Sequence, residues 1–121
     1  MIDRIRLTAA AKVQLSTLKR KTGIEHYNSI CRHALCLSLS NASVPPDEDL
    51  NFSGGVEIDW KIFAGGNEQL YINLLLQRLA ADGIALETEN VRRACISHLH
   101  RGLSYLVGRP DDYIMGVSGR I

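Results

Sequence analysis

The chain has 121 residues, of which 45% are hydrophobic and 22% are charged, and its formal net charge is +1. This size and composition are typical of one soluble globular domain without low-complexity segments. Three cysteines, an odd number, argue against a secreted disulfide framework, and the longest apolar run is far shorter than the roughly 20 residues that cross a bilayer. We therefore expect a cytoplasmic protein with no signal peptide and no membrane partner.

The positive charge is concentrated at the N-terminus. Residues 1–40 contain seven of the 14 basic residues but only two acidic residues, Asp3 and Glu25, so this segment has a net charge of +5. Segregated positive charge suits a polyanionic partner, and nucleic acid is the commonest large polyanion inside a cell. The asymmetry therefore directs attention to DNA or RNA binding.

This basic segment is predicted to begin with a strand and a helix. Residues 4–7 alternate polar and apolar side chains, which is the period of a half-buried strand. Thr8 is a suitable N-cap for a helix over residues 9–22, and Gly23 suits the left-handed residue that ends such a helix. Within the helix we expect Val13 to lie on the inner face.

A second helix is predicted over residues 25–39, because apolar side chains recur there at i, i+3, i+4, i+7 and i+8. These side chains are Tyr27, Ile30, Cys31, Ala34 and Leu35. Leu37 and Leu39 extend the apolar surface beyond this stripe. We therefore expect the helix to pack on two sides, the second of which belongs to another subunit.

The remainder is predicted to contain one strand, over residues 56–62, and two helices, over residues 68–82 and 89–107, with Gly102 marking a close approach of two helices. The expected fold is mainly α, a four-helix domain with short strands whose N-terminal part resembles a ribbon-helix-helix. Its single domain divides into a basic strand-helix-helix segment, a linker, a strand with two helices, and a loose tail: residues 1–40, 41–55, 56–108 and 109–121.

In a ribbon-helix-helix the second helix begins at a DNA phosphate, because its first amides and the positive end of its dipole face the anion. Here the cations just before that helix are the main candidates, with further basic residues and one amide in support. The candidate DNA-binding residues are Lys19, Arg20, Lys21, Arg4, Arg6, Lys12, Asn28 and Arg32. A solvated helix end is the alternative explanation for the lysine–arginine cluster, and Glu25 argues against strong phosphate binding. No cluster suited to reading base edges is present.

The sequence contains no pattern typical of a metal site or of a catalytic site. Cys31 and Cys36 are five residues apart, which is not a zinc-binding spacing, and His98 and His100 point to different sides of a helix. There is no nucleophile elbow and no phosphate-cradling loop. We therefore expect no metal, no cofactor and no catalytic residues.

Four stretches of the sequence resemble the DndE family. They are LSTLKRKTGI (15–24), NSICRHALCLSLS (28–40), LLLQRLAADGI (74–84) and HLHRGLSYLVGR (98–109). The resemblance implies a small non-catalytic component of a bacterial DNA phosphorothioation system, which replaces a non-bridging oxygen of the DNA backbone with sulfur. It also implies self-association, as a tetramer, contacts with other proteins of the system, and binding to double-stranded DNA with a preference for nicked duplex.

Three alternatives remain at this point. A ribbon-helix-helix regulator would read a specific palindrome through Arg4 and Arg6. A sulfur-carrying protein would accept persulfide on Cys31, Cys36 or Cys95. A bridging subunit would bind partner proteins through Leu37 and Leu39 or through the acidic linker.

Overall fold

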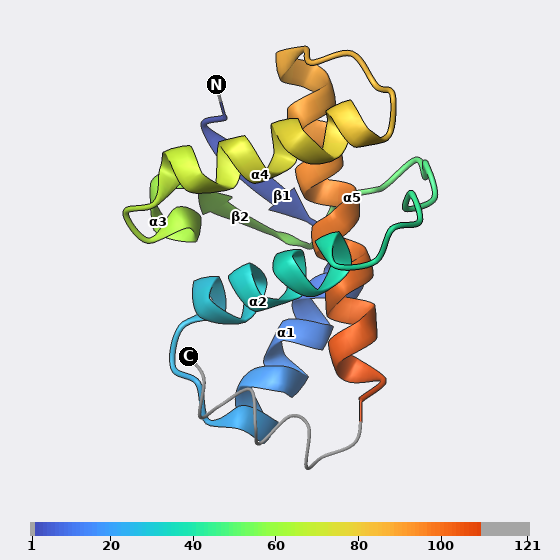
Figure 1. Ribbon diagram of the computed structural model, residues 1–121. Helices are drawn as coiled ribbons and strands as arrows, with labels where there is room; N and C mark the ends of the chain where they lie inside the picture. The colour runs from blue at the N-terminus through green and yellow to red at the C-terminus, as the bar shows by residue number, and fades with distance from the viewer. Residues whose placement is uncertain (1, 110–121) are drawn as a thin grey trace.

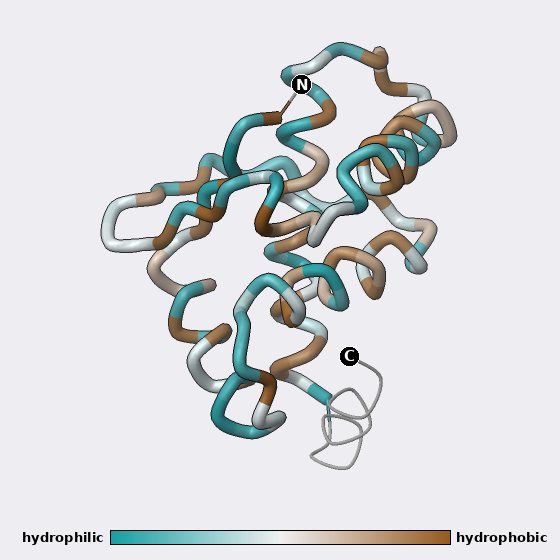
Figure 2. Tube along the Cα trace, turned by 90° about the vertical axis from the view of Figure 1, so that its left-hand side faces the viewer, coloured by the Kyte–Doolittle hydropathy of each residue, from teal (hydrophilic) through white to brown (hydrophobic). Residues whose placement is uncertain are grey.

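The longest described helix, α5 (Thr88–Val107), runs through the middle of the molecule, and the other elements pack around it (Figure 1). The computed structural model describes residues 2–109, so all of the predicted tail except Arg109 lies outside the described residues. Helices α1 (Ala9–Thr22), α2 (Tyr27–Leu39) and α4 (Glu68–Ala81) and strand β1 (Arg4–Leu7) all contact α5. Hydrophobic and hydrophilic residues alternate along the helices (Figure 2), as expected when one face of each helix is buried.

The expectation of a mainly α fold with short strands is confirmed, but the number of helices is not. The described residues contain five helices, because a fifth, α3 (Trp60–Ala64), lies where the sequence predicts the end of a strand. Strand β2 (Val56–Asp59) ends after four residues, and the Trp60 amide then donates to the Asp3 carbonyl, 2.9 Å away. In α3 the buried side chains are Trp60, Phe63 and Ala64, whereas Ile62 is exposed, so the burial follows a helical period.

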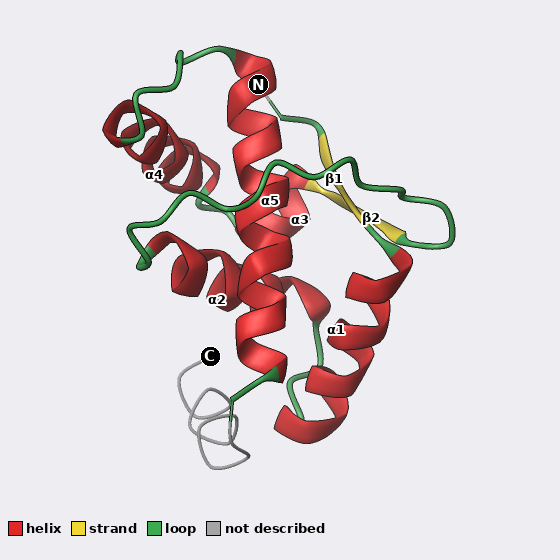
Figure 3. Ribbon diagram, turned by 90° about the vertical axis from the view of Figure 1, so that its right-hand side faces the viewer, coloured by secondary structure: helices red, strands yellow, loops and turns green. Residues whose placement is uncertain are grey.

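The two strands pair with each other within the chain. β1 and β2 lie side by side (Figure 3). They are antiparallel, with Arg4 opposite Asp59 and Leu7 opposite Val56. Ile5 and Leu7 are fully buried against α5 and α1, whereas the arginines of β1 face outward. In this chain the N-terminal strand is therefore paired internally.

Helix α1 has the predicted ends. The Thr8 hydroxyl accepts a hydrogen bond from the Ala11 amide, 3.1 Å away, and Gly23 adopts the left-handed conformation with a φ of 73°. The predicted inner position of Val13 is wrong, because this side chain is 65% exposed. The buried stripe consists instead of Ala11, Leu15, Leu18 and Thr22.

Helix α2 begins at Tyr27, two residues later than predicted, and packs most extensively on α5. The two helices approach so closely at Gly102 that a Cβ on this residue would lie 1.8 Å from the Ala34 carbonyl oxygen. The close approach predicted at Gly102 is therefore confirmed. Leu37 and Leu39 are half-buried and pack against the core of the same chain.

The segment 41–55 contains no helix or strand, as expected of a linker, but two arginines hold its first residues in place. Arg78 of α4 donates to the carbonyls of Leu39, Asn41 and Ser43, and it is buried beside Asp82. Arg101 of α5 also donates to the Ser43 carbonyl. No helix within residues 2–109 has the length and hydrophobicity that a membrane span requires.

Candidate nucleic-acid interface

Helix α1 carries four basic residues and no acidic residue over its 14 positions. Its buried stripe faces the protein, so Lys12, Lys19, Arg20 and Lys21 are all exposed. Because the helix repeats every 3.6 residues, Lys12, Lys19 and Arg20 lie within about 100° of its circumference. Four of the candidate DNA-binding residues are thereby gathered on one helix.

Three of the four cations of α1 are not paired with a carboxylate of the described residues. Within residues 2–109, no ion pair involves Lys12, Lys19 or Arg20. The Lys19 Nζ atom lies 5.1 Å from the centroid of the Tyr27 ring, and the Tyr27 hydroxyl is 3.2 Å from Ser16 Oγ. A cation over an aromatic face keeps its full charge, so this contact orients Lys19 without neutralising it.

Strand β1 presents a different electrostatic environment. The carboxylate of Glu57 on β2 lies 3.3 Å from Arg4 Nη1 and 3.3 Å from Arg6 Nε. The Arg6 guanidinium also lies 5.1 Å from the centroid of the Phe52 ring. These exposed pairs contribute only about 0–1 kcal/mol each, but they reduce the positive charge that β1 presents to a polyanion.

Asn28 and Arg32 are tied to α3. Asn28 Nδ2 donates to the Ile62 carbonyl at 3.1 Å, and Arg32 Nη1 donates to the Phe63 carbonyl at 2.9 Å. These carbonyls belong to the last turn of α3, where a helix supplies few donors of its own, although the Ile62 carbonyl also accepts the Gly65 amide at 3.3 Å. The two side chains therefore hold α2 against α3, and neither belongs to the cationic face of α1.

The N-terminus of α2, predicted to receive a phosphate, borders a groove of about 520 Å³. Lys19 and His26 line this groove, but so do three acidic residues, Glu25, Glu57 and Asp59. This excess of carboxylates disfavours an anion there. The exposed face of α1 is consequently the stronger candidate for a phosphate-binding surface.

A buried Ser–His pair lies elsewhere, and the sequence analysis did not anticipate it. Ser38 Oγ lies 2.8 Å from His98 Nδ1, and it also accepts a hydrogen bond from Arg101 Nε at 2.8 Å. Burial, followed by the nearby Arg78 and Arg101 charges, lowers the pKa of His98 to about 4. The pair joins α2 to α5, and its Ser38 side chain is fully buried.

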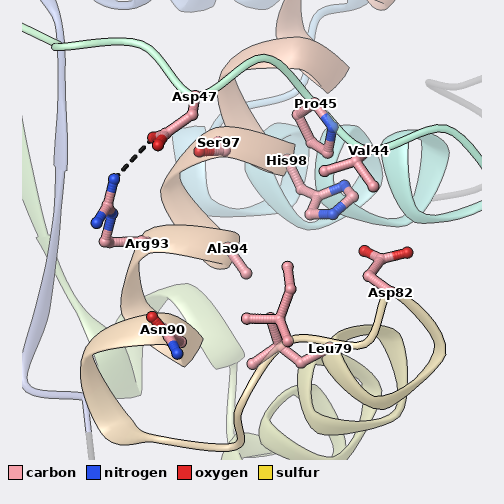
Figure 4. A pocket seen from close by; sticks show the side chains of 11 residues that line it. Val44, Pro45, Asp47, Leu79, Asp82, Asn90, Arg93, Ala94, Ser97 and His98 are labelled. Carbon is pink, nitrogen blue, oxygen red and sulfur yellow. Dashed lines mark hydrogen bonds and ion pairs between the residues drawn. The ribbon is translucent and has the colours of Figure 1, made fainter.

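His98 also borders a cavity of about 230 Å³ between α4, α5 and the loop that contains Pro45 (Figure 4). The dashed line in Figure 4 marks the ion pair between Arg93 Nη2 and Asp47 Oδ1, which are 2.7 Å apart and connect the loop to α5. Asp82, which also lines the cavity, is already paired with Arg78 at 2.9 Å. The charged groups of this cavity thus have partners within the chain.

The cysteines are poorly suited to carrying sulfur. Burial raises the pKa of both Cys31 and Cys95 to about 12, with the nearby Arg32 opposing the rise at Cys31 and Cys31 adding to it at Cys95. Cys36 is exposed, yet partial desolvation also raises the pKa of its thiol. Since the thiolate is the reactive form, Cys31 and Cys95 are poor nucleophiles near neutral pH, and the raised pKa also disfavours the thiolate of Cys36. In the described part of the chain, His, Cys, Asp and Glu side chains form no group that could hold a metal ion.

A family model and a solved structure give consistent matches to this chain. The sequence pattern of a family described as "DNA sulphur modification protein DndE" matches residues 4–112. The crystal structure of DndE from Escherichia coli B7A, which is described as involved in DNA phosphorothioation modification, superposes with a TM-score of 0.69. It shares 23% sequence identity with this chain, and the match covers 88% of this chain and 99% of that one. No curated protein matches the chain. The family match extends over most of the sequence, and the chain therefore belongs to the DndE family of DNA sulphur modification proteins.

Proposed function

We propose that the chain is a non-catalytic, DNA-binding component of a cytoplasmic DNA phosphorothioation system, and that the exposed face of α1 contacts the DNA backbone. Membership of the DndE family supports the association with sulfur modification of DNA. The observation that carries DNA binding is the composition of α1, a helix with four exposed basic residues and no acid.

The geometry of α1 suits phosphates better than base edges. From Lys12 to Arg20 the helix rises about 12 Å. This length spans between three and four phosphates of one DNA strand when they are counted along the duplex axis, at about 3.4 Å per phosphate. Lysine acts as a point charge for phosphate, whereas bases are usually read by bidentate arginine, asparagine or glutamine. Asn28 and Arg32, the candidates with such side chains on α2, are engaged with α3. We therefore propose binding that tolerates any DNA sequence.

Two finer features of the proposal come from the family resemblance. One is a preference for nicked duplex, and the other is assembly into a homotetramer that contacts other proteins of the system. A symmetric assembly would repeat the basic face of α1 and strengthen the local positive potential. Leu37 and Leu39 remain our proposed contribution of α2 to that assembly, although both already pack on the core of their own chain.

The test is a salt titration of DNA binding with matched charge removals. The double substitution Lys12→Gln/Arg20→Gln removes two α1 charges that make no hydrogen bond or ion pair within residues 2–109. The control, Arg92→Gln/Arg93→Gln, removes two charges near the start of α5, at the other end of the molecule from α1 (Figure 1). Fluorescence anisotropy with intact and nicked duplexes would give the affinity at several salt concentrations.

We expect the α1 variant to bind more weakly and to flatten the plot of log affinity against log salt by about 1.8, since each lost phosphate contact contributes about 0.9. The control should change neither quantity appreciably. An α1 variant that keeps the wild-type slope would refute the proposed surface. A nicked duplex that binds no better than an intact one would refute the preference alone.

The same assay separates the proposal from a sequence-specific regulator. Such a regulator would depend on Arg4 and Arg6, which here share the carboxylate of Glu57. Excess random DNA should displace the labelled duplex if binding is to the backbone. Binding that survives this competition would favour the regulator.

A further inference from the structure

A second groove lies across α3 and α4, and its charge is opposite to that of α1. It has a volume of about 550 Å³ and is bounded by the start of β1, the junction of β2 with α3, and the first half of α4. In Figure 1, α3 and α4 lie in the upper half of the molecule, near the N-terminus of the chain, whereas α1 lies at the bottom. Of the residues that line it, only Asp59 also lines the groove that reaches Lys19, so the two surfaces meet at that residue alone.

The floor of this groove is apolar. Ile2, Trp60 and Ile72 line it while being only 5%, 6% and 8% exposed, and Leu76 adds a half-buried side chain. The Trp60 ring is held from behind by Phe63, with a centroid separation of 5.3 Å and an interplanar angle of 22°. The floor is consequently preformed, so the binding of a ligand would not have to order these side chains, and the entropy cost of binding is lower.

The rim of the groove is acidic. Asp3, Asp59 and Glu68 line it together with a single cation, Lys61. Within residues 2–109, none of these three carboxylates takes part in an ion pair, and Asp59, at the cap position of α3, makes no capping hydrogen bond through its side chain. The groove therefore carries a net charge of about −2, which repels DNA phosphates and attracts cations.

We infer that this acidic groove, which we define as the surface lined by Ile2, Asp3, Asp59, Trp60, Glu68 and Ile72, binds a basic segment of a partner protein. Lysine or arginine side chains of that segment would face the three carboxylates. Its apolar side chains would cover Ile72 and the exposed edge of Trp60. Charge complementarity requires the partner to carry positive charge. The apolar floor favours a polypeptide over a simple cation, because only a polypeptide brings apolar side chains to cover it.

Trp60 makes this inference directly measurable. It is the only tryptophan in the chain, so intrinsic fluorescence reports on the groove alone. The probe is a helical peptide composed of leucine and lysine, and its leucine–glutamate counterpart is the peptide control. Peptide is titrated into the full chain, and the tryptophan emission is followed.

The matched variants remove two carboxylates each. Asp3→Asn/Glu68→Gln changes the acidic groove, whereas Glu48→Gln/Asp49→Asn changes two exposed acids of the linker that do not line it. All four side chains lie at the surface, so both variants should keep the far-UV circular dichroism of the wild type.

We expect the leucine–lysine peptide to shift Trp60 emission saturably and the leucine–glutamate peptide to leave it unchanged. The groove variant should bind the basic peptide about fivefold more weakly, the loss of two solvent-exposed charge pairs, while the linker variant stays within about twofold of wild type. Absence of saturable binding, an unmoved emission spectrum, or equal weakening by the two variants would overturn the inference. DNA binding through α1 is measured separately, so either proposal can fail without the other.

Discussion

The contact between α2 and α5 at Gly102 allows a quantitative prediction for the substitution Gly102→Ala. A Cβ at this position would lie 1.8 Å from the carbonyl oxygen, 2.4 Å from the carbonyl carbon and 2.9 Å from the Cα atom of Ala34. To reach the 3.4 Å at which ordinary contact begins, the two helices would have to separate by about 1.6 Å. The obstructing atoms are all backbone, so no side-chain rotation relieves the overlap.

Overpacking of a core by single methylene groups typically costs 1–3 kcal/mol and occasionally more, and the higher helix propensity of alanine returns about 1 kcal/mol. Because a backbone shift is required here, we take the upper end of that cost and expect a net loss of about 2 kcal/mol in the free energy of unfolding. A loss of that size is a large part of the 5–15 kcal/mol typical of a domain. At about 4 °C per kcal/mol, the melting temperature should fall by about 8 °C.

Urea denaturation followed by far-UV circular dichroism measures this difference. Gly108→Ala is the matched control, since Gly108 ends the same helix with a φ of −80° and its added Cβ would meet atoms only at 3.5 Å and beyond. We expect the control to stay within about 0.5 kcal/mol of wild type. If Gly102→Ala also unfolded within about 1 kcal/mol of wild type, the close approach of α2 to α5 would be refuted.

Two further predictions concern titratable groups. A thiol reagent should label Cys36 in the folded protein, and Cys31 and Cys95 only after unfolding, because both are buried and have pKa values raised to about 12; rapid native labelling of two or more thiols would contradict this burial. The pKa of His98 falls from 6.5 to about 4 on folding, so between these values the unfolded chain binds more protons, and the free energy of unfolding should decrease as the pH drops. In the variant His98→Gln, urea denaturation across this pH range should show a free energy of unfolding that changes less steeply with pH. Part of the pH dependence should remain, because the pKa of His100 is also lowered. If the variant had the same pH dependence as the wild type, His98 would be excluded as its source.

Local sequence patterns were sufficient for helix α1 because its ends depend only on neighbouring residues. Thr8 and Gly23 act as predicted through contacts within four residues of themselves. The burial of Val13 could not be decided in the same way. One apolar stripe of α1 contains Val13 and another contains Leu15. The second stripe is buried because it faces α5 and α2, and the sequence of α1 alone does not specify where those helices lie.

The largest error in the predicted fold is the missing helix α3. This error also explains why Asn28 and Arg32 were predicted to contact DNA. The alternation of Val56, Ile58, Trp60 and Ile62 has the period of a strand. The helical period of Trp60, Phe63 and Ala64 lies in the same residues and prevails because it buries three side chains. The predicted strand offered no helix-end carbonyls to the side chains of Asn28 and Arg32. Asn28 and Arg32 therefore seemed available to DNA, whereas in the structure they bond those carbonyls.

The sequence was sufficient to predict the features of the candidate site that depend on the charges of one helix. It was not sufficient for the features that depend on ion pairs between different strands and helices. The cations of α1 follow directly from the absence of acids over residues 9–22. The partial neutralisation of Arg4 and Arg6 depends on the register that places Glu57 opposite Arg6, and no local pattern specifies that register.

The same separation of charges is what the proposed DNA binding requires of a chain with a net charge of only +1. For 121 residues the expected radius of gyration is about 14 Å, which exceeds the Debye length of about 8 Å at physiological ionic strength. Charges at opposite ends of such a molecule are screened from each other, so the field near α1 is set by α1 and not by the net charge. It follows that the variant Asp3→Asn/Glu68→Gln should leave the salt slope of DNA binding unchanged.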